Sequence, residues 1–364
     1  MSTRVFVGLS GGVDSSLSCA LLAEQGYDVT AVYMRNWSRD LPGFRCPWAD
    51  ELADAERVAV TVGCELLVWD FEEEYKKTVV DYLVDSYRRG WTPNPDVMCN
   101  QTIKFGSFAK RAFAEGADLI ATGHYARLQK TQDDMAPQLL RAKDEHKDQT
   151  YFLWRVAATT FSRVLFPIGD FSSKAQVRTA CAERGLGVQD KPDSDGICFV
   201  GPVGIRSFLL DSLDQRAGNI VEWETGRVLG AHDGAFLFTV GQRRGLNLGG
   251  GPARYVVATD VKANIVYVSD NPDCSALWMR ELLLTDTCWV SGQPPVAGSY
   301  LVRCRHTGKL RQAEVVPDNK NAAKLVFSEP LRRVACGQSA VIYDGLICLG
   351  GGIVCGPKPV RHSA

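Results

Sequence analysis

Apolar and polar positions follow a regular order from Arg4 to about residue 170: a short apolar run, a glycine-rich or polar turn, then an amphipathic stretch. The apolar runs have the length and composition of β-strands, and the stretches after them have helical periodicity. Strands that alternate with helices predict a parallel, doubly wound α/β sheet, whose ligands bind beyond the carboxyl ends of the strands. The predicted strands are Arg4–Leu9, Val29–Met34, Glu65–Phe71 and Asp118–Thr122.

Beyond Gly201 the pattern changes to short β-like runs separated by glycine and proline, which is typical of all-β structure. An Asn-Pro-Asp turn near residue 271 marks a second boundary. We therefore predict three domains, with residues 1–204 forming the α/β domain, 205–272 a central β-rich domain and 273–364 a C-terminal β domain. The predicted strands here are Asn219–Trp223, Phe236–Val240, Tyr255–Thr259, Ile265–Val268, Tyr300–Arg305, Ala313–Val316, Lys324–Phe327 and Ser339–Tyr343.

Composition excludes several classes of protein. Hydrophobic residues make up 45% and charged residues 23% of the 364 residues, which are ordinary globular values. No apolar run approaches the roughly 18 residues that cross a bilayer, and the first strand pattern leaves no room for a cleaved leader. We expect a cytoplasmic protein without a membrane partner. The 12 cysteines form no C-x-x-C pair, which argues against a zinc ribbon and gives an iron–sulfur cluster little support.

The net charge of −1 means that any nucleic-acid partner has to be bound by local basic patches. Taken singly, each patch has the composition of an ordinary solvated surface. The candidates are Arg243 with Arg244, the C-terminal group Arg303, Arg305, His306, Lys309 and Arg311, the pair Arg332 and Arg333, and the tail with Lys358 and Arg361.

The first predicted strand runs into a serine- and glycine-rich loop, Ser10 to Ser16, followed by a helix. Glycine lets the backbone pass close to a ligand, while the N–H groups of the helix start and the serine hydroxyls can bind phosphate oxygens. The loop lacks the Gly-Lys-Ser/Thr ending of the Walker loop, which disfavours γ-phosphoryl transfer of that kind. It resembles the signature of the PP-loop ATP pyrophosphatases, which adenylate their substrates. Asp14 is a candidate ligand for Mg²⁺.

Two cysteines stand in segments that favour chemistry over packing. Cys99 follows a proline-rich segment, Trp91–Met98, and precedes a helix predicted over Ile103–Glu115. A thiol near a helix N-terminus has its thiolate stabilised, which suits a nucleophile. Cys198 lies among turn residues, in Asp193-Ser194-Asp195-Gly196-Ile197-Cys198. Any single cysteine is more often a buried apolar residue, so the pair carries the prediction.

Motifs along nearly the whole chain resemble, in order, the tRNA-specific 2-thiouridylase family of the PP-loop ATP pyrophosphatase superfamily. The resemblance implies an adenine nucleotide alpha hydrolase-like domain, a small central β domain and a C-terminal β-barrel that binds tRNA. The matching segments are the Ser10 loop, the Asn94-Pro95-Asp96 segment with Cys99, Ala121–Tyr125, Lys147–Leu153, Gly196–Phe199, Thr239–Leu246, Gly337–Val341 and Cys348–Gly352.

The resemblance implies that the C2 oxygen of wobble uridine 34 is adenylated with ATP and replaced by sulfur, which gives 2-thiouridine, AMP and pyrophosphate. It implies a persulfide on Cys198, received from a sulfur-carrier protein or cysteine desulfurase, with Cys99 as the nucleophile and Asp96 as a general base or base-orienting group. The implied ATP contacts are Gly8, Leu9, Ser10, Gly11, Gly12, Val13, Asp14, Ser15, Met34 and Gly123. The implied tRNA contacts are Asn94, Pro95, Asp96, His124, Lys147, Asp148, Gln149, Arg305, His306 and Gln338.

Two other functions fit parts of the sequence. Another PP-loop adenylating ligase or amidotransferase would need no cysteine pair. A catalytically inactive RNA-binding relative would need neither an intact Ser-Gly-Gly-Val-Asp-Ser loop nor both cysteines. We expect an active enzyme that uses ATP and Mg²⁺ and works as a monomer on tRNA.

Overall fold

The computed structural model describes residues 2–40, 46–130, 136–193, 204–318 and 321–356. The predicted parallel sheet is confirmed, and its strand order is β3-β2-β1-β4-β7 with every pairing parallel. Its strands are β1 (Arg4–Gly8), β2 (Asp28–Arg35), β3 (Glu65–Asp70), β4 (Leu119–Ala121) and β7 (Val164–Leu165). The chain order reverses between β1 and β4, so the crevice beyond these two strands is the expected ligand site.

Alternating residues of β1 face the two layers of helices. Val5 and Val7 are buried in a cluster with residues of α1, α2 and α8, while Phe6 packs on the other face near Trp69. This period of two is what a strand covered on both sides requires. The helices of the first layer are α1 (Val13–Glu24), α2 (Trp48–Val62) and α8 (Lys174–Glu183).

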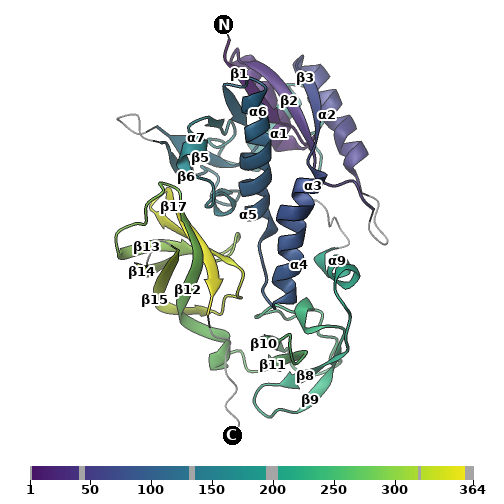
Figure 1. Cartoon of the computed structure of the whole chain (residues 1–364), viewed down its shortest axis with the longest axis vertical. Coiled ribbons are helices and arrows are strands. Elements are labelled where there is room, and N and C mark those ends of the chain that lie inside the picture. Colours follow the sequence, from purple (N-terminus) through teal and green to yellow (C-terminus); the bar gives the residue numbers. More distant parts are fainter. Residues whose placement is uncertain (1, 41–45, 131–135, 194–203, 319–320, 357–364) are drawn as a thin grey trace.

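Two long helices with π-helical turns form the other layer and extend beyond the sheet (Figure 1). The first is α3 (Glu72–Tyr75), η1 (Lys76–Val80) and α4 (Asp81–Arg88). The second is α5 (Pro95–Cys99), η2 (Asn100–Phe108) and α6 (Ala109–Ala114). The short segments η3 (Thr150–Phe152) and α7 (Ala158–Phe161) follow. Every helix among the described residues is too short or too polar to cross a bilayer.

The central part begins with helix α9 (Gly204–Ser212) and forms a four-stranded sheet of order β10-β11-β8-β9. Its strands are β8 (Gly218–Glu222), β9 (Val228–His232), β10 (Tyr255–Asp260) and β11 (Ile265–Ser269). The strand predicted over Phe236–Val240 is wrong. Its first residues belong instead to a 3₁₀ turn, η5 (Ala235–Leu237), because Ala235 and Phe236 are buried there without strand pairing. Strand β9, which contains Gly230, was not predicted from the sequence pattern.

Six C-terminal strands close into an antiparallel barrel through the pairing of β12 with β17. The short segment η6 (Ser275–Leu277) leads into it. The strands are β12 (Trp278–Trp289), β13 (Gly298–Arg303), β14 (Arg311–Asp318), β15 (Ala322–Arg332), β16 (Ser339–Asp344) and β17 (Ile347–Cys355). A hairpin from the first half of the chain, β5 (Ala126–Gln129) and β6 (Gln138–Arg141), extends this sheet through the pair Leu140 and Ile347. Neither this hairpin nor β12 and β17 was predicted.

Buried polar contacts join the barrel to the segment that follows β6. The carboxylate of Asp148 accepts hydrogen bonds from Arg303 of β13 at 3.0 Å and from Arg141 of β6 at 3.4 Å. The hydroxyl of Tyr151 donates to the Ser339 carbonyl at 3.0 Å. All of these side chains are buried, so these contacts tie the barrel to that segment.

Candidate active site

A cavity of about 460 Å³ lies at the carboxyl ends of β1 and β4, where the strand order reverses. This is the place that the sequence pattern predicted for a ligand. Four parts of the chain meet there: the Ser10–Ser16 loop (the phosphate loop), the segment after β4, the Asn94–Cys99 region and the barrel. The lining residues are Gly8, Ser10, Asp14, Ser15, Met34, Asp96, Cys99, Asn100, Lys104, Thr122, Gly123, His124, Tyr125, Lys147, Gln149, Phe152, Asp193 and His306.

The phosphate loop is shaped by backbone geometry. Gly11 has φ +70°, and a Cβ there would lie 2.5 Å from the Glu51 carbonyl oxygen, so only glycine fits. The Ser10 N–H donates to Ser15 Oγ at 3.2 Å, and the Ser16 hydroxyl donates to the Gly12 carbonyl at 2.7 Å. These bonds fix the turn that leads into α1.

The segment after β4 lies directly against this helix start. A Cβ on Gly123 would lie 2.6 Å from the Ser15 nitrogen, so the close approach requires glycine. Of the predicted ATP contacts, Gly8, Ser10, Asp14, Ser15, Met34 and Gly123 line the cavity. The side chains of Leu9 and Val13 are buried in the core behind the loop and support it from there.

The predicted start of the Cys99 helix is wrong. Helix α5 begins at Pro95, not near Ile103, because Asn94 caps it: the Asn94 Oδ1 accepts a hydrogen bond from the Asp96 N–H at 3.1 Å. Proline at the first helical position strengthens this start. Cys99 therefore lies inside a helix that continues to Ala114, one turn beyond the N-terminus. Its side chain is only 5% exposed, and it lines the cavity.

Asp96 lies one turn before Cys99 and also lines the cavity. Burial raises the pKa of Asp96 to about 6, and the positive charge of Lys104 opposes this rise. A carboxyl group with such a pKa exchanges protons close to neutral pH, which is what a general base requires. His124 differs, because burial and Lys104 lower its pKa well below the usual value and keep it neutral.

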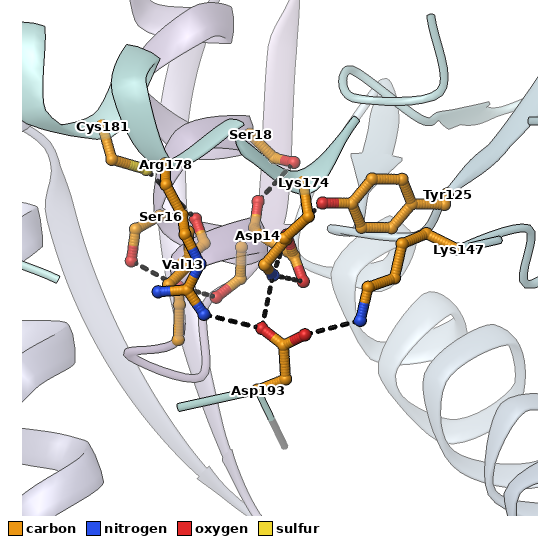
Figure 2. A network of polar contacts seen from close by, with 12 residues as sticks. Val13, Asp14, Ser16, Ser18, Tyr125, Lys147, Lys174, Arg178, Cys181 and Asp193 are labelled. Carbon is orange, nitrogen blue, oxygen red and sulfur yellow. Dashed lines mark hydrogen bonds and ion pairs between the residues drawn. The ribbon is translucent and has the colours of Figure 1, made fainter. Parts of the chain in front are cut away.

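A network of charges borders the phosphate loop (Figure 2). Lys174 Nζ lies 2.7 Å from both carboxylate oxygens of Asp14, and the Tyr125 hydroxyl donates to Asp14 at 2.8 Å. The carboxylate of Asp193 accepts from Lys147 at 2.5 Å and from Arg178 at 2.9 Å, and lies 3.2 Å from Lys174. The loop is thus surrounded by cations that are paired with two acids.

Sequence reasoning missed Lys174, Arg178 and Asp193 as site residues. Lys174 and Arg178 are four residues apart in α8, so they lie on one face of the helix, close to its N-terminus. That spacing is a signal in the sequence. The spacing does not say which neighbouring element this face of α8 meets. Only the contact between α1 and α8 brings the face to the loop.

The three consecutive residues predicted to contact tRNA, Lys147 to Gln149, have side chains in three different surroundings. Lys147 extends into the cavity toward Asp193. Gln149 is held against Tyr125, since its Oε1 accepts from the Tyr125 N–H at 3.0 Å. The carboxylate of Asp148 is buried between two arginines, and this geometry gives it a structural role with no side-chain surface for RNA.

The other predicted tRNA residues are also spread over different surroundings. The ring of His124 is buried beside Phe105, and the ring of His306 lies 4.3 Å from that of Phe152 at the cavity wall. Gln338 Nε2 donates to the Thr92 carbonyl at 2.8 Å, next to the Asn94 cap. Arg305 is exposed.

Two predictions about reactive groups receive no support from these contacts. Cys198 lies outside the described residues. Asp14 is already engaged by Lys174, and no group of three or more His, Cys, Asp or Glu side chains within the described ranges could hold a metal ion. The described residues therefore do not by themselves form a Mg²⁺ site.

The fold and the loop define a class: a PP-loop nucleotide-binding α/β domain joined to two β domains. Family profiles match all three parts. They are described as tRNA methyl transferase HUP domain over residues 3–202, tRNA methyl transferase PRC-barrel domain over residues 206–270 and aminomethyltransferase beta-barrel domain over residues 279–354.

Full-length relatives refine this class. The chain is 41% identical over 364 aligned residues to the tRNA-specific 2-thiouridylase MnmA of Aromatoleum aromaticum, covering 96% of this chain and 97% of the relative. It is 43% identical over 357 residues to that of Cupriavidus metallidurans, covering 96% and 99%. The relative from Idiomarina loihiensis is 42% identical over 360 residues, covering 97% and 96%. The chain belongs to the tRNA-specific 2-thiouridylase family, as its motifs predicted.

Proposed function

We propose that this protein is a tRNA-uridine 2-sulfurtransferase that adenylates the C2 oxygen of wobble uridine 34 with ATP and then replaces that oxygen with sulfur. The products are 2-thiouridine, AMP and pyrophosphate. One observation carries the proposal: a single cavity is lined both by the phosphate loop and by Asp96 and Cys99. The names of the full-length relatives support the same reaction.

ATP binds at the phosphate-loop end. The N–H groups at the start of α1 and the hydroxyls of Ser10 and Ser15 hold its phosphates, and Gly8, Met34 and Gly123 line the adjoining wall. The α-phosphorus then faces the rest of the cavity. Mg²⁺ would arrive with the nucleotide and neutralise pyrophosphate as it leaves.

The target uridine enters at the opposite end. Asn94, Pro95 and Asp96 border it, and the capped helix start keeps them in a fixed arrangement. Asp96 orients the base or accepts its proton. Adenylation turns the C2 oxygen into part of a good leaving group, AMP, which the oxide alone is not.

Sulfur comes from a persulfide on Cys198, loaded by a sulfur-carrier protein or a cysteine desulfurase. The terminal sulfur attacks C2, and AMP departs with the former base oxygen. The Cys99 thiolate attacks the Cys198 sulfur, so the bond to the transferred sulfur breaks and its electron pair stays with that sulfur. A disulfide between residues 99 and 198 remains, and a thiol reductant reopens it. The protein acts on tRNA as a monomer.

The test uses Cys198→Ser and Cys99→Ser in the full chain, with Cys355→Ser on the barrel strand β17 as the matched control. Each protein is incubated with ATP, tRNA and a persulfide donor. Pyrophosphate release measures adenylation, while AMP release and nucleoside mass spectrometry measure sulfur transfer. We expect both active-site variants to lose 2-thiouridine and to retain adenylation, and the control to remain active. An adenylating ligase or amidotransferase would keep its activity with either cysteine substituted. Bound tRNA without any AMP would indicate an inactive RNA-binding protein.

A further inference from the structure

The side chain of Asp193 holds together three cations at the edge of the phosphate loop. Lys147 reaches it from the segment after β6, while Lys174 and Arg178 reach it from α8. Figure 2 shows these cations converging on one carboxylate, next to Asp14 in the first turn of α1. The first turn of α1 is far in the sequence from Lys147, α8 and Asp193, so its meeting with them is a product of the tertiary fold.

This cluster has the chemistry of an oligophosphate site. Lysine ammonium and arginine guanidinium groups bind carboxylate and phosphate oxygens through the same charge-assisted hydrogen bonds. Lys147 and Asp193 line the cavity together with Ser10 and Ser15 of the phosphate loop. Lys174 and Arg178 do not line the cavity themselves but contact Asp193, so an anion that takes the place of the Asp193 carboxylate meets all three cations.

We propose that Lys147, Lys174 and Arg178 form the subsite for the pyrophosphate part of ATP, and that the Asp193 carboxylate is an internal anion that pyrophosphate must displace. This inference rests on the proposed function in so far as ATP is the source of the pyrophosphate. It gives Lys147 a phosphate role in place of the predicted tRNA contact. It also assigns phosphate-binding roles to Lys174 and Arg178, and makes Asp193 a competitor that sets the affinity for nucleotide.

The charges of the cluster support the exchange. Burial raises the pKa of Asp193, but the bonds from Lys147 and Lys174 outweigh this and lower it to about 2, so the competitor stays ionised at physiological pH. Its side chain is 29% exposed, and ion pairs of such exposure contribute little each. Pyrophosphate carries more charge and more acceptor oxygens than one carboxylate, so it gains more from the same cations.

The experiment is titration calorimetry of the full chain with inorganic pyrophosphate, with EDTA and again with Mg²⁺. Asp193→Asn removes the competing charge, and Asp233→Asn, in an exposed pair with Arg206, is the control with the same change in net charge. We expect Asp193→Asn to lower the Kd about three- to tenfold, as loss of a partly exposed ion pair implies. Lys174→Gln and Arg178→Gln should raise the Kd at least threefold. The control should leave it unchanged.

Several results would overturn the inference. An unchanged or higher Kd for pyrophosphate in Asp193→Asn would overturn it. If this variant binds pyrophosphate more weakly only when Mg²⁺ is present, Asp193 is a metal ligand instead. If an α8 variant fails to fold, Lys147→Met, whose side chain is 40% exposed, tests the same cluster. Calorimetry needs neither tRNA nor a sulfur donor. A protein that binds pyrophosphate as expected but never thiolates tRNA would refute the proposed function and leave the subsite standing.

Discussion

The two ends of the cavity are built in different ways. The phosphate end is made by backbone: Gly11 lets the loop approach α2, and Gly123 lets the segment after β4 approach the start of α1, more closely than any side chain allows. The opposite end is made by side chains that three separate regions bring together, with Asp96 and Cys99 from α5, Phe152 from the segment after the β5–β6 hairpin and His306 from the barrel. The first end depends on local sequence, and the second depends on how the domains are joined.

This difference predicts different consequences of substitution. A change at the phosphate end should damage nucleotide binding through a local clash. A change at the domain junction should damage the opposite end through loss of the barrel contact.

Asp148→Ala should lower the free energy of unfolding by about 3–5 kcal/mol, because it leaves the buried guanidinium groups of Arg141 and Arg303 without their carboxylate. Urea unfolding measures this. The control is Asp170→Ala, whose carboxylate is 84% exposed beside Arg127 and should change stability by less than about 1 kcal/mol. Unchanged stability with weakened tRNA binding would restore the RNA-contact prediction for Asp148 and contradict the structural role.

Gly11→Ala should cost about 2–4 kcal/mol and raise the Kd for ATP, since the new methyl group meets the Glu51 carbonyl and φ is positive. The matched variant is Gly12→Ala, where φ is −89° and the nearest atom to a Cβ is the Ser10 hydroxyl at 3.4 Å. That change should cost about 1 kcal/mol or less. Unfolding curves and nucleotide titration compare the two. Equal effects at both positions would refute the argument from backbone geometry.

The pH dependence of Asp96 gives the smallest effect. Its folded-state pKa, about 6, exceeds the ordinary 3.8, so the folded protein holds the proton more strongly than the unfolded chain does. Stability contributed by this group therefore falls as pH rises from about 4 to about 6, and the penalty is complete above that window. Asp96→Asn should gain stability relative to the original protein at pH 7.5 but not at pH 4.5. A stability difference that is the same at both pH values would contradict the raised pKa.

Cys99 shows where local reasoning was insufficient. The prolines of the Trp91–Asp96 segment predicted a stiff loop, with the helix expected from Ile103. In the structure Asn94 and Pro95 act as cap and first turn, so the same residues begin the helix earlier. The capping signal was present in the sequence. A proline that can either break or start a helix leaves the choice to its surroundings.

The sequence by itself determined the parallel sheet, the loop that replaces a Walker motif and the family. Each of these depends on residues close together in the chain, through apolar periodicity or glycine geometry. Only the tertiary structure decided that β6 pairs with β17, that Asp148 is buried between two arginines and that Asp193 meets three cations. Those contacts join positions up to about two hundred residues apart. No periodic pattern encodes them, because they depend on which faces the packed domains bring together.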